Sequence, residues 1–267
     1  MKLHRWTTTA AAVAFFGVTT LTGASAASAQ EAAATGYVAL GDSYSSGLGA
    51  GDYDSDSGNC KRSANAYAQQ WAAANSPSSF DFTACSGART GDVLSDQLGP
   101  LSASTGLVSI SIGGNDAGFA DTMQACVLQG ESVCLTKIEE AKGYITGTLP
   151  GQLDSVYNAI TERAASAKVV VLGYPSMYKL EGECSVGLSE ASRAAINSAS
   201  DVLNETIAKR AADHGFAFGD VRGAFAGHEI CSGDSWLHSV TFPIGESYHP
   251  TTTGQSSGYL PVMESAA

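Results

Sequence analysis

The stretch Tyr37-Val-Ala-Leu-Gly-Asp-Ser-Tyr-Ser-Ser-Gly47 joins a short apolar run to a polar, glycine-rich turn. The run ends at Gly41, which predicts a buried strand over residues 37–40 and a turn directly after it. Ser43 lies in that turn, where a helix should begin. A serine at this point either caps the helix or presents its hydroxyl as a nucleophile. The stretch therefore predicts a strand-turn-helix unit with a candidate nucleophile at its turn.

A second motif, Gly113-Gly-Asn-Asp116, follows the alternating aliphatic and serine residues 107–112. The alternation predicts a strand that ends at the two glycines. Asn115 can donate its side-chain amide to a developing oxyanion, although an ordinary turn also accounts for it. Gly87, within Cys85-Ser-Gly-Ala-Arg-Thr90, is a candidate backbone donor to the same oxyanion or a simple turn glycine.

A nucleophilic serine needs a base, and His249 in Glu246-Ser-Tyr-His-Pro250 is the candidate. Glu246, three residues upstream, could accept the imidazole Nδ1 proton and fix the tautomer. The backbone carbonyl of Ser247 or Glu246 is the alternative partner for that proton. Ser43, His249 and Glu246 are thus the predicted catalytic residues, with the Ser43 and Gly87 amides and the Asn115 side chain as oxyanion donors.

Strand and helix patterns alternate along the chain, which predicts an α/β fold with a mostly parallel sheet covered on both faces. Sites in such sheets form at the carboxyl ends of the strands, where Ser43, Gly87 and Asn115 all fall. The expected strands are residues 37–40, 80–84, 107–112, 168–172 and 216–221. The expected helices include one around Tyr67 and Trp71 capped by Ser63, one with the buried stripe Leu153, Val156, Tyr157 and Ile160, and one from about Ser189 to Asp213.

With Ser43, Gly87, Asn115 and His249 in this order, the chain resembles the SGNH, or GDSL, hydrolase family over nearly its whole length after residue 36. It is most similar to secreted actinobacterial GDSL lipases and phospholipases, through the stretches 85–93, 113–120 and 227–231. The resemblance implies a three-layer, flavodoxin-like α/β/α sandwich around a five-stranded parallel sheet. It also implies Ser43 as nucleophile, His249 as base and the oxyanion donors named above. The broad family often has Asp where this chain has Glu246.

The N-terminus has the pattern of an export signal. Lys2 and Arg5 precede a short apolar run over residues 10–21, and small residues at 24–29 offer cleavage sites. The apolar run is shorter than the roughly 20 residues that a membrane span needs. We therefore expect a signal peptide over residues 1–29, with a cleavage end that could extend to about residue 36, followed by a single domain over 37–267 that is secreted and extracellular.

Six cysteines follow the signal, an even number that predicts three disulfides in an exported chain. Six cysteines allow 15 connectivities. The sequential pairing Cys60–Cys85, Cys126–Cys134 and Cys184–Cys231 is favoured because Cys126 and Cys134 can close a small loop, and the family resemblance supports it. No Cys-x-x-Cys pair or other metal cluster is visible, so we expect no metal and no cofactor.

Loss of Lys2 and Arg5 with the signal changes the formal charge from −12 to −14. An acidic surface argues against nucleic-acid partners and against electrostatic adsorption to anionic membranes. We expect a monomer with no stable membrane anchor that acts on small-molecule esters. Apolar residues near the motifs suggest an acyl-binding groove: Tyr44, Phe119, Tyr174, Pro175, Met177, Phe242 and Ile244.

The predicted function is a secreted serine lipase or esterase that hydrolyses lipid esters through an acyl-Ser43 intermediate. A phospholipase A1 is the alternative from the same chemistry. An acyltransferase or sugar-ester deacetylase could use the same site. A non-catalytic secreted binding module, stapled by disulfides, is the alternative from another class of protein.

Overall fold

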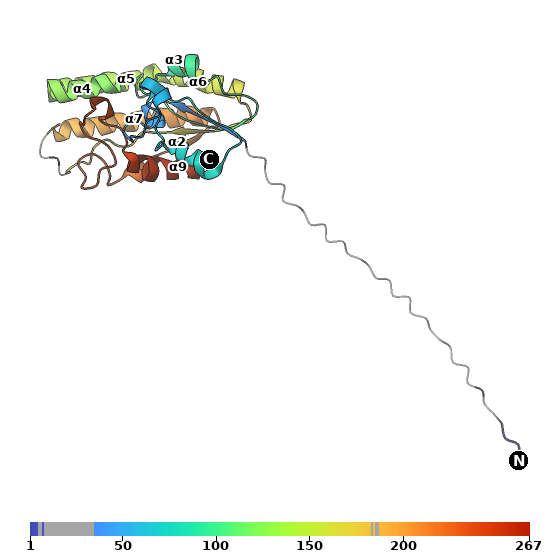
Figure 1. Ribbon diagram of the computed structural model, residues 1–267. Helices are drawn as coiled ribbons and strands as arrows, with labels where there is room; N and C mark the ends of the chain where they lie inside the picture. Colours follow the sequence, from blue (N-terminus) through green and yellow to red (C-terminus); the bar gives the residue numbers. More distant parts are fainter. Residues whose placement is uncertain (5–6, 8–34, 183, 185–186) are drawn as a thin grey trace. The chain divides into compact units, whose positions relative to one another are not determined.

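A computed structural model of the chain describes residues 1–4, 7, 35–182, 184 and 187–267. Most of the predicted signal peptide, residues 1–29, lies outside the described residues. Residues from Ala34 to the C-terminus form one compact unit. The description that follows concerns this unit (Figure 1).

Five parallel strands form the central sheet in the order β2-β1-β3-β4-β5. The predicted parallel α/β sheet is therefore confirmed, although β2 and β5 are shorter than expected and β3 begins earlier. The strands are β1 (Gly36–Gly41), β2 (Phe80–Phe82), β3 (Thr105–Ser111), β4 (Lys168–Leu172) and β5 (Ala217–Gly219). Nearly every residue of β1, β3 and β4 is buried, because helices cover both faces of the sheet.

Two groups of helices cover the sheet and make the expected three layers (Figure 1). On one side lie α5 and α6, with α7 packed against both of them and against β4 and β5. On the other side α9 packs against α2, β4 and β5. The longer helices are α2 (Tyr67–Asn75), α4 (Phe119–Gln129), α5 (Glu131–Gly147), α6 (Leu149–Arg163), α7 (Glu190–Asp213) and α9 (Leu260–Ala266). Short helices are α1 (Ser43–Ser46), α3 (Thr90–Asp92) and α8 (Arg222–Phe225).

The long helix α7 begins as its sequence predicts, because the Ser189 side chain accepts the backbone N–H of Ser192 at the helix N-cap. The expected cap of α2 is wrong. Ala66 occupies that N-cap without a side-chain hydrogen bond. The Ser63 hydroxyl instead donates to the Gly51 carbonyl and accepts the Asn65 N–H, so it stabilises the turn before the helix. The predicted stripe on α6 is buried in full.

Three disulfides join Cys60 to Cys85, Cys126 to Cys134, and Cys184 to Cys231. The first ties a surface turn to the loop after β2, and the second ties α4 to α5. Cross-links of this kind typically contribute about 2–4 kcal/mol each by restricting the unfolded chain. None of the helices among the described residues is long and apolar enough to cross a bilayer.

Candidate active site

The carboxyl ends of β1 and β3 bring the two glycine motifs together. Ser43 is the first residue of α1, directly after β1, and Asn115 follows β3. Because β1 and β3 pair in parallel, both motifs emerge at the same edge of the sheet. Ser43, Gly87, Asn115 and His249 all line one cavity at this edge.

Ser43 and His249 lie within hydrogen-bond reach although 206 residues separate them. The imidazole Nε2 is 2.8 Å from the Ser43 Oγ, and Nδ1 is 2.9 Å from the Ser247 carbonyl oxygen. A carbonyl can only accept, so Nδ1 carries the proton and Nε2 is left with its lone pair toward the serine hydroxyl. This is the tautomer that a general base requires.

Burial lowers the pKa of His249 to about 4, and the hydrogen bond to Ser247 opposes this shift. The imidazole is therefore neutral at pH 7 and available to take a proton. Ser43 is itself only 5% exposed, so a proton that passes from its hydroxyl to the imidazole moves away from bulk water.

The structure does not bring the Glu246 carboxylate to His249, which corrects the expected role of this residue as orienter. The Glu246 Oε1 accepts the hydroxyl of Tyr53 at 2.8 Å, and that hydroxyl accepts the Gly49 N–H at 2.9 Å. The chain turns sharply at Tyr248, whose φ is +66°, so the Ser247 carbonyl faces the imidazole instead. The proton on Nδ1 of His249 is therefore held by a backbone carbonyl, that of Ser247.

Hydrogen bonds join the Gly87 and Asn115 loops. The Asn115 Nδ2 donates one of its two hydrogens to the Ala88 carbonyl at 3.0 Å. The second hydrogen is not used in this bond. Asp116 accepts both the backbone N–H and the hydroxyl of Thr90. These contacts hold the two loops side by side at the cavity. The Gly87 N–H and the Asn115 amide can then donate to the same substrate oxygen.

The cavity has a volume of about 600 Å³ and a mostly apolar wall. Helices α4, α5 and α7 supply most of that wall. Its apolar residues include Phe119, Met123, Leu128, Ile138, Ile145, Ile196, Ala199 and Leu203. Of the predicted groove residues, Tyr44, Phe119, Tyr174, Met177 and Ile244 line the cavity, whereas Pro175 and Phe242 do not. The Pro175 carbonyl is bonded to the Ser200 hydroxyl, and Phe242 is 93% exposed.

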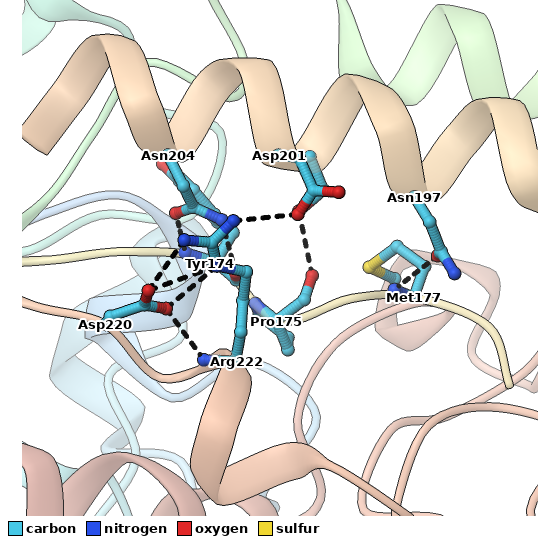
Figure 2. Close-up of polar contacts among 9 residues, drawn as sticks. Tyr174, Pro175, Met177, Asn197, Asp201, Asn204, Asp220 and Arg222 are labelled. Atoms are coloured by element: carbon cyan, nitrogen blue, oxygen red, sulfur yellow. Dashed lines mark hydrogen bonds and ion pairs between the residues drawn. The ribbon is translucent and has the colours of Figure 1, made fainter.

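The segment after β4 is held against α7 by a row of polar side chains (Figure 2). Asn204 accepts the Tyr174 N–H and donates to the Tyr174 carbonyl, both at 2.8 Å. Farther along α7, Asn197 bonds the backbone of Met177 and Tyr178. This row fixes the position from which Tyr174 reaches the cavity.

The Gly-x-Ser-x-Gly spacing, which is typical of another class of serine hydrolase and which we did not expect in this chain, occurs at residues 254–258. In the structure these residues lie in the helical segment Gly254–Tyr259, and the nearest preceding strand of the described chain, β5, ends at Gly219. The Ser256 hydroxyl is bonded to the Thr253 carbonyl. The pattern is therefore not a strand-to-helix nucleophile turn.

The described residues contain no group of three or more His, Cys, Asp or Glu side chains placed to hold a metal ion. The candidate site thus consists of a serine, an imidazole, several N–H donors and an apolar cavity.

Comparison with known proteins gives a consistent result. Residues 39–256 match the model of the GDSL-like Lipase/Acylhydrolase family. The chain is 68% identical over 249 residues to Lipase 1 from Streptomyces coelicolor, covering 92% of both chains. It is similar to the crystal structure of an extracellular lipase from Streptomyces rimosus, with 67% identity and a TM-score of 0.86, and to that of phospholipase A1 from Streptomyces albidoflavus, with 64% identity and a TM-score of 0.87. Each match covers 88% of this chain and all of the solved chain.

Proposed function

The chain belongs to the GDSL-like lipase/acylhydrolase family, and we propose that it is a secreted lipase that cleaves lipid carboxylic esters through a covalent acyl-Ser43 intermediate. The observation that carries the proposal is the Ser43–His249 hydrogen bond at the head of an apolar cavity. The single compact unit is then one hydrolase domain, and we propose a monomer; one chain supplies every group of the candidate site, so the site needs no second subunit.

The reaction has two steps that use the same groups. The Ser43 Oγ forms a bond to the ester carbonyl carbon while its proton passes to the His249 Nε2. The oxyanion is stabilised by the Ser43 and Gly87 amides and the Asn115 Nδ2. The carbon–oxygen bond to the alcohol breaks, and the alcohol leaves with the proton from His249. Water then attacks the acyl-Ser43 ester, gives its proton to His249, and releases the fatty acid as Ser43 is protonated again.

The shape of the cavity and its surroundings supports a lipid as the source of the ester. Several large apolar side chains are exposed around the cavity mouth: Val127, Leu128, Val240 and Ile244, with Phe242 between the last two in sequence. A mouth of this kind suits contact with the surface of a lipid aggregate. The acidic net charge favours neutral or zwitterionic surfaces over anionic ones.

Secretion is supported by three observations. Residues 1–29 have the pattern of a signal peptide, and the described cysteines form disulfides, which persist in oxidising compartments. A similar protein is named as an extracellular lipase.

The substrate proposal is tested by narrowing the cavity. Ala199 on α7 lines the wall, and Ala199→Phe should exclude about two methylenes of a long acyl chain, each worth roughly 0.8 kcal/mol. We expect kcat/KM for p-nitrophenyl palmitate to fall at least about tenfold, while p-nitrophenyl butyrate is cleaved as before. Ala194→Phe, on an exposed position of the same helix, is the matched control. An unchanged chain-length profile would show that the acyl chain binds elsewhere.

Phospholipase A1 activity is the second candidate, favoured by the similarity to the Streptomyces albidoflavus enzyme. Fatty-acid release from a triacylglycerol emulsion and from phosphatidylcholine vesicles distinguishes the two. Release from the sn-1 position of phosphatidylcholine at the higher rate would establish the phospholipase. Hydrolysis of acetylated sugars, with neither lipid cleaved, would contradict a lipid substrate.

Because the Ser247 carbonyl holds the imidazole, Glu246→Gln should have a small effect on the chemical step. We expect kcat to fall less than about threefold, since the amide oxygen can still accept from Tyr53. Steady-state kinetics on p-nitrophenyl butyrate measure this change. A loss comparable to that of His249→Ala would mean that the carboxylate orients the base after all.

A further inference from the structure

Asp42, the residue before Ser43, is a buried carboxylate with no ion pair to any described residue. It is 1% exposed, and the groups that donate to it are uncharged. The Tyr44 N–H and the Ser111 hydroxyl donate to its Oδ1 at 3.0 and 2.8 Å, and the Tyr174 hydroxyl donates to its Oδ2. Burying a charge without a counter-ion costs stability, so the position requires an explanation.

Tyr174 connects this carboxylate to the loop that carries Asn115. Its hydroxyl has one proton, which goes to Asp42, and its oxygen accepts the Gly114 N–H at 3.3 Å. The ring also lies close to Gly114, where an added Cβ would be 3.4 Å from the phenol. The nucleophile turn and the Asn115 loop are thus joined through two hydrogen bonds at one phenol.

Tyr174 is itself held in place by contacts with α7 and with Tyr44. Asn204 of α7 bonds both the N–H and the carbonyl of Tyr174, and the ring packs edge-on against Tyr44 at 5.1 Å between centroids (Figure 2 shows the α7 side). A rigid phenol with a fixed proton direction can position a neighbouring loop to within a fraction of an ångström.

We propose that the Asp42 carboxylate and Tyr174 act as a pair of positioning residues: ionised Asp42 fixes the direction of the Tyr174 hydroxyl, and Tyr174 fixes the Gly114 N–H and with it the donor geometry at Asn115. The inference rests on the proposed function, because it assigns Asn115 to the oxyanion hole. It explains why a charge is kept buried beside the nucleophile.

The arrangement has a consequence for pH dependence. Burial raises the pKa of Asp42 to about 6, and the hydrogen bonds from Tyr174, Ser111 and the α1 backbone oppose the shift. The titratable groups that face Asp42 are the phenols of Tyr44, Tyr67, Tyr174 and Tyr259, all with raised pKa values that keep them neutral.

Below about pH 6 Asp42 gains a proton and no longer fixes the Tyr174 hydroxyl. His249 remains neutral down to about pH 4. The acid limb of kcat/KM should therefore lie near pH 6, not near pH 4.

The test compares Tyr174→Phe and Asp42→Asn with the wild type on p-nitrophenyl butyrate from pH 4 to 9. We expect Tyr174→Phe to lower kcat at least about tenfold with little change in KM, because a misplaced oxyanion donor affects the transition state.

Asp42→Asn should lower the maximum of kcat/KM by a similar factor, and its pH profile should lose the acid limb near pH 6. Its melting temperature at pH 8 should equal or exceed that of the wild type, since the buried charge is gone. A purely structural role would lower the melting temperature and leave the acid limb in place.

Tyr144→Phe is the matched control, because it removes the hydrogen bond of another phenol, from α5 to the Gln152 side chain of α6, and Tyr144 does not line the cavity. It should leave kcat and the pH profile unchanged. Labelling with a p-nitrophenyl alkylphosphonate, which reacts with a nucleophilic serine, distinguishes failure of the proposed function from failure of the positioning role. Failure to label Ser43 in the wild type would overturn the proposed function. Labelling of wild type and Tyr174→Phe at the same rate, or wild-type kcat in Tyr174→Phe, would overturn the positioning role.

Discussion

Replacing either Ser43 or His249 with alanine is expected to remove ester hydrolysis almost completely. The hydroxyl and the imidazole act as one unit, because the 2.8 Å hydrogen bond between them is the path of the proton. In serine hydrolases such a loss reaches roughly 10⁶-fold in kcat. The double variant should lose no more than either single one, since the unit fails when one member is gone.

The measurement is the hydrolysis of p-nitrophenyl butyrate, combined with mass spectrometry of the protein after treatment with the phosphonate. Wild type should gain one phosphonyl group on Ser43, Ser43→Ala none, and His249→Ala one at a greatly reduced rate. His214→Ala is the matched control: this histidine contacts Asp154 at the end of α7 and should affect stability without affecting kcat. Near-normal turnover by Ser43→Ala would disprove the covalent mechanism.

Local patterns were sufficient to predict the elements that hold the nucleophile and the Asn115 loop. Apolar runs that end in glycine marked β1, β3 and β4, and a parallel sheet then places Ser43 and Asn115 at one edge. The pairing of His249 with Ser43 followed from chemical need, because no local pattern relates residues 206 apart.

Other features depend on three-dimensional detail that the sequence does not express locally. Glu246 and the Ser247 carbonyl are both near His249 in sequence, and the turn at Tyr248 decides between them. The wall helix α5 was missed because its few buried positions give a weak apolar stripe. Asp42 and Tyr174 are 132 residues apart, so only the folded chain shows that their side chains meet.

Asn115→Ala is expected to lower kcat about 10²- to 10³-fold while changing KM little. The amide donates to the oxyanion, which exists in the transition state and the tetrahedral intermediate but not in the bound ester. The substitution also removes the hydrogen bond to Ala88, a loss of about 1 kcal/mol in stability that leaves the protein folded at 25 °C.

Two further variants make the assignment specific. Asn115→Asp keeps the shape of the side chain but replaces the donor with a negative oxygen, so it should be more damaging than alanine because it repels the oxyanion. Asn65→Ala removes a comparable amide-to-carbonyl bond, to Ala50, outside the cavity, and should leave kcat unchanged. Phosphonate labelling of Ser43 should slow in Asn115→Ala, because the phosphoryl oxygen uses the same donors. If Asn115→Ala raised KM and left kcat intact, the amide would bind the substrate without stabilising the transition state.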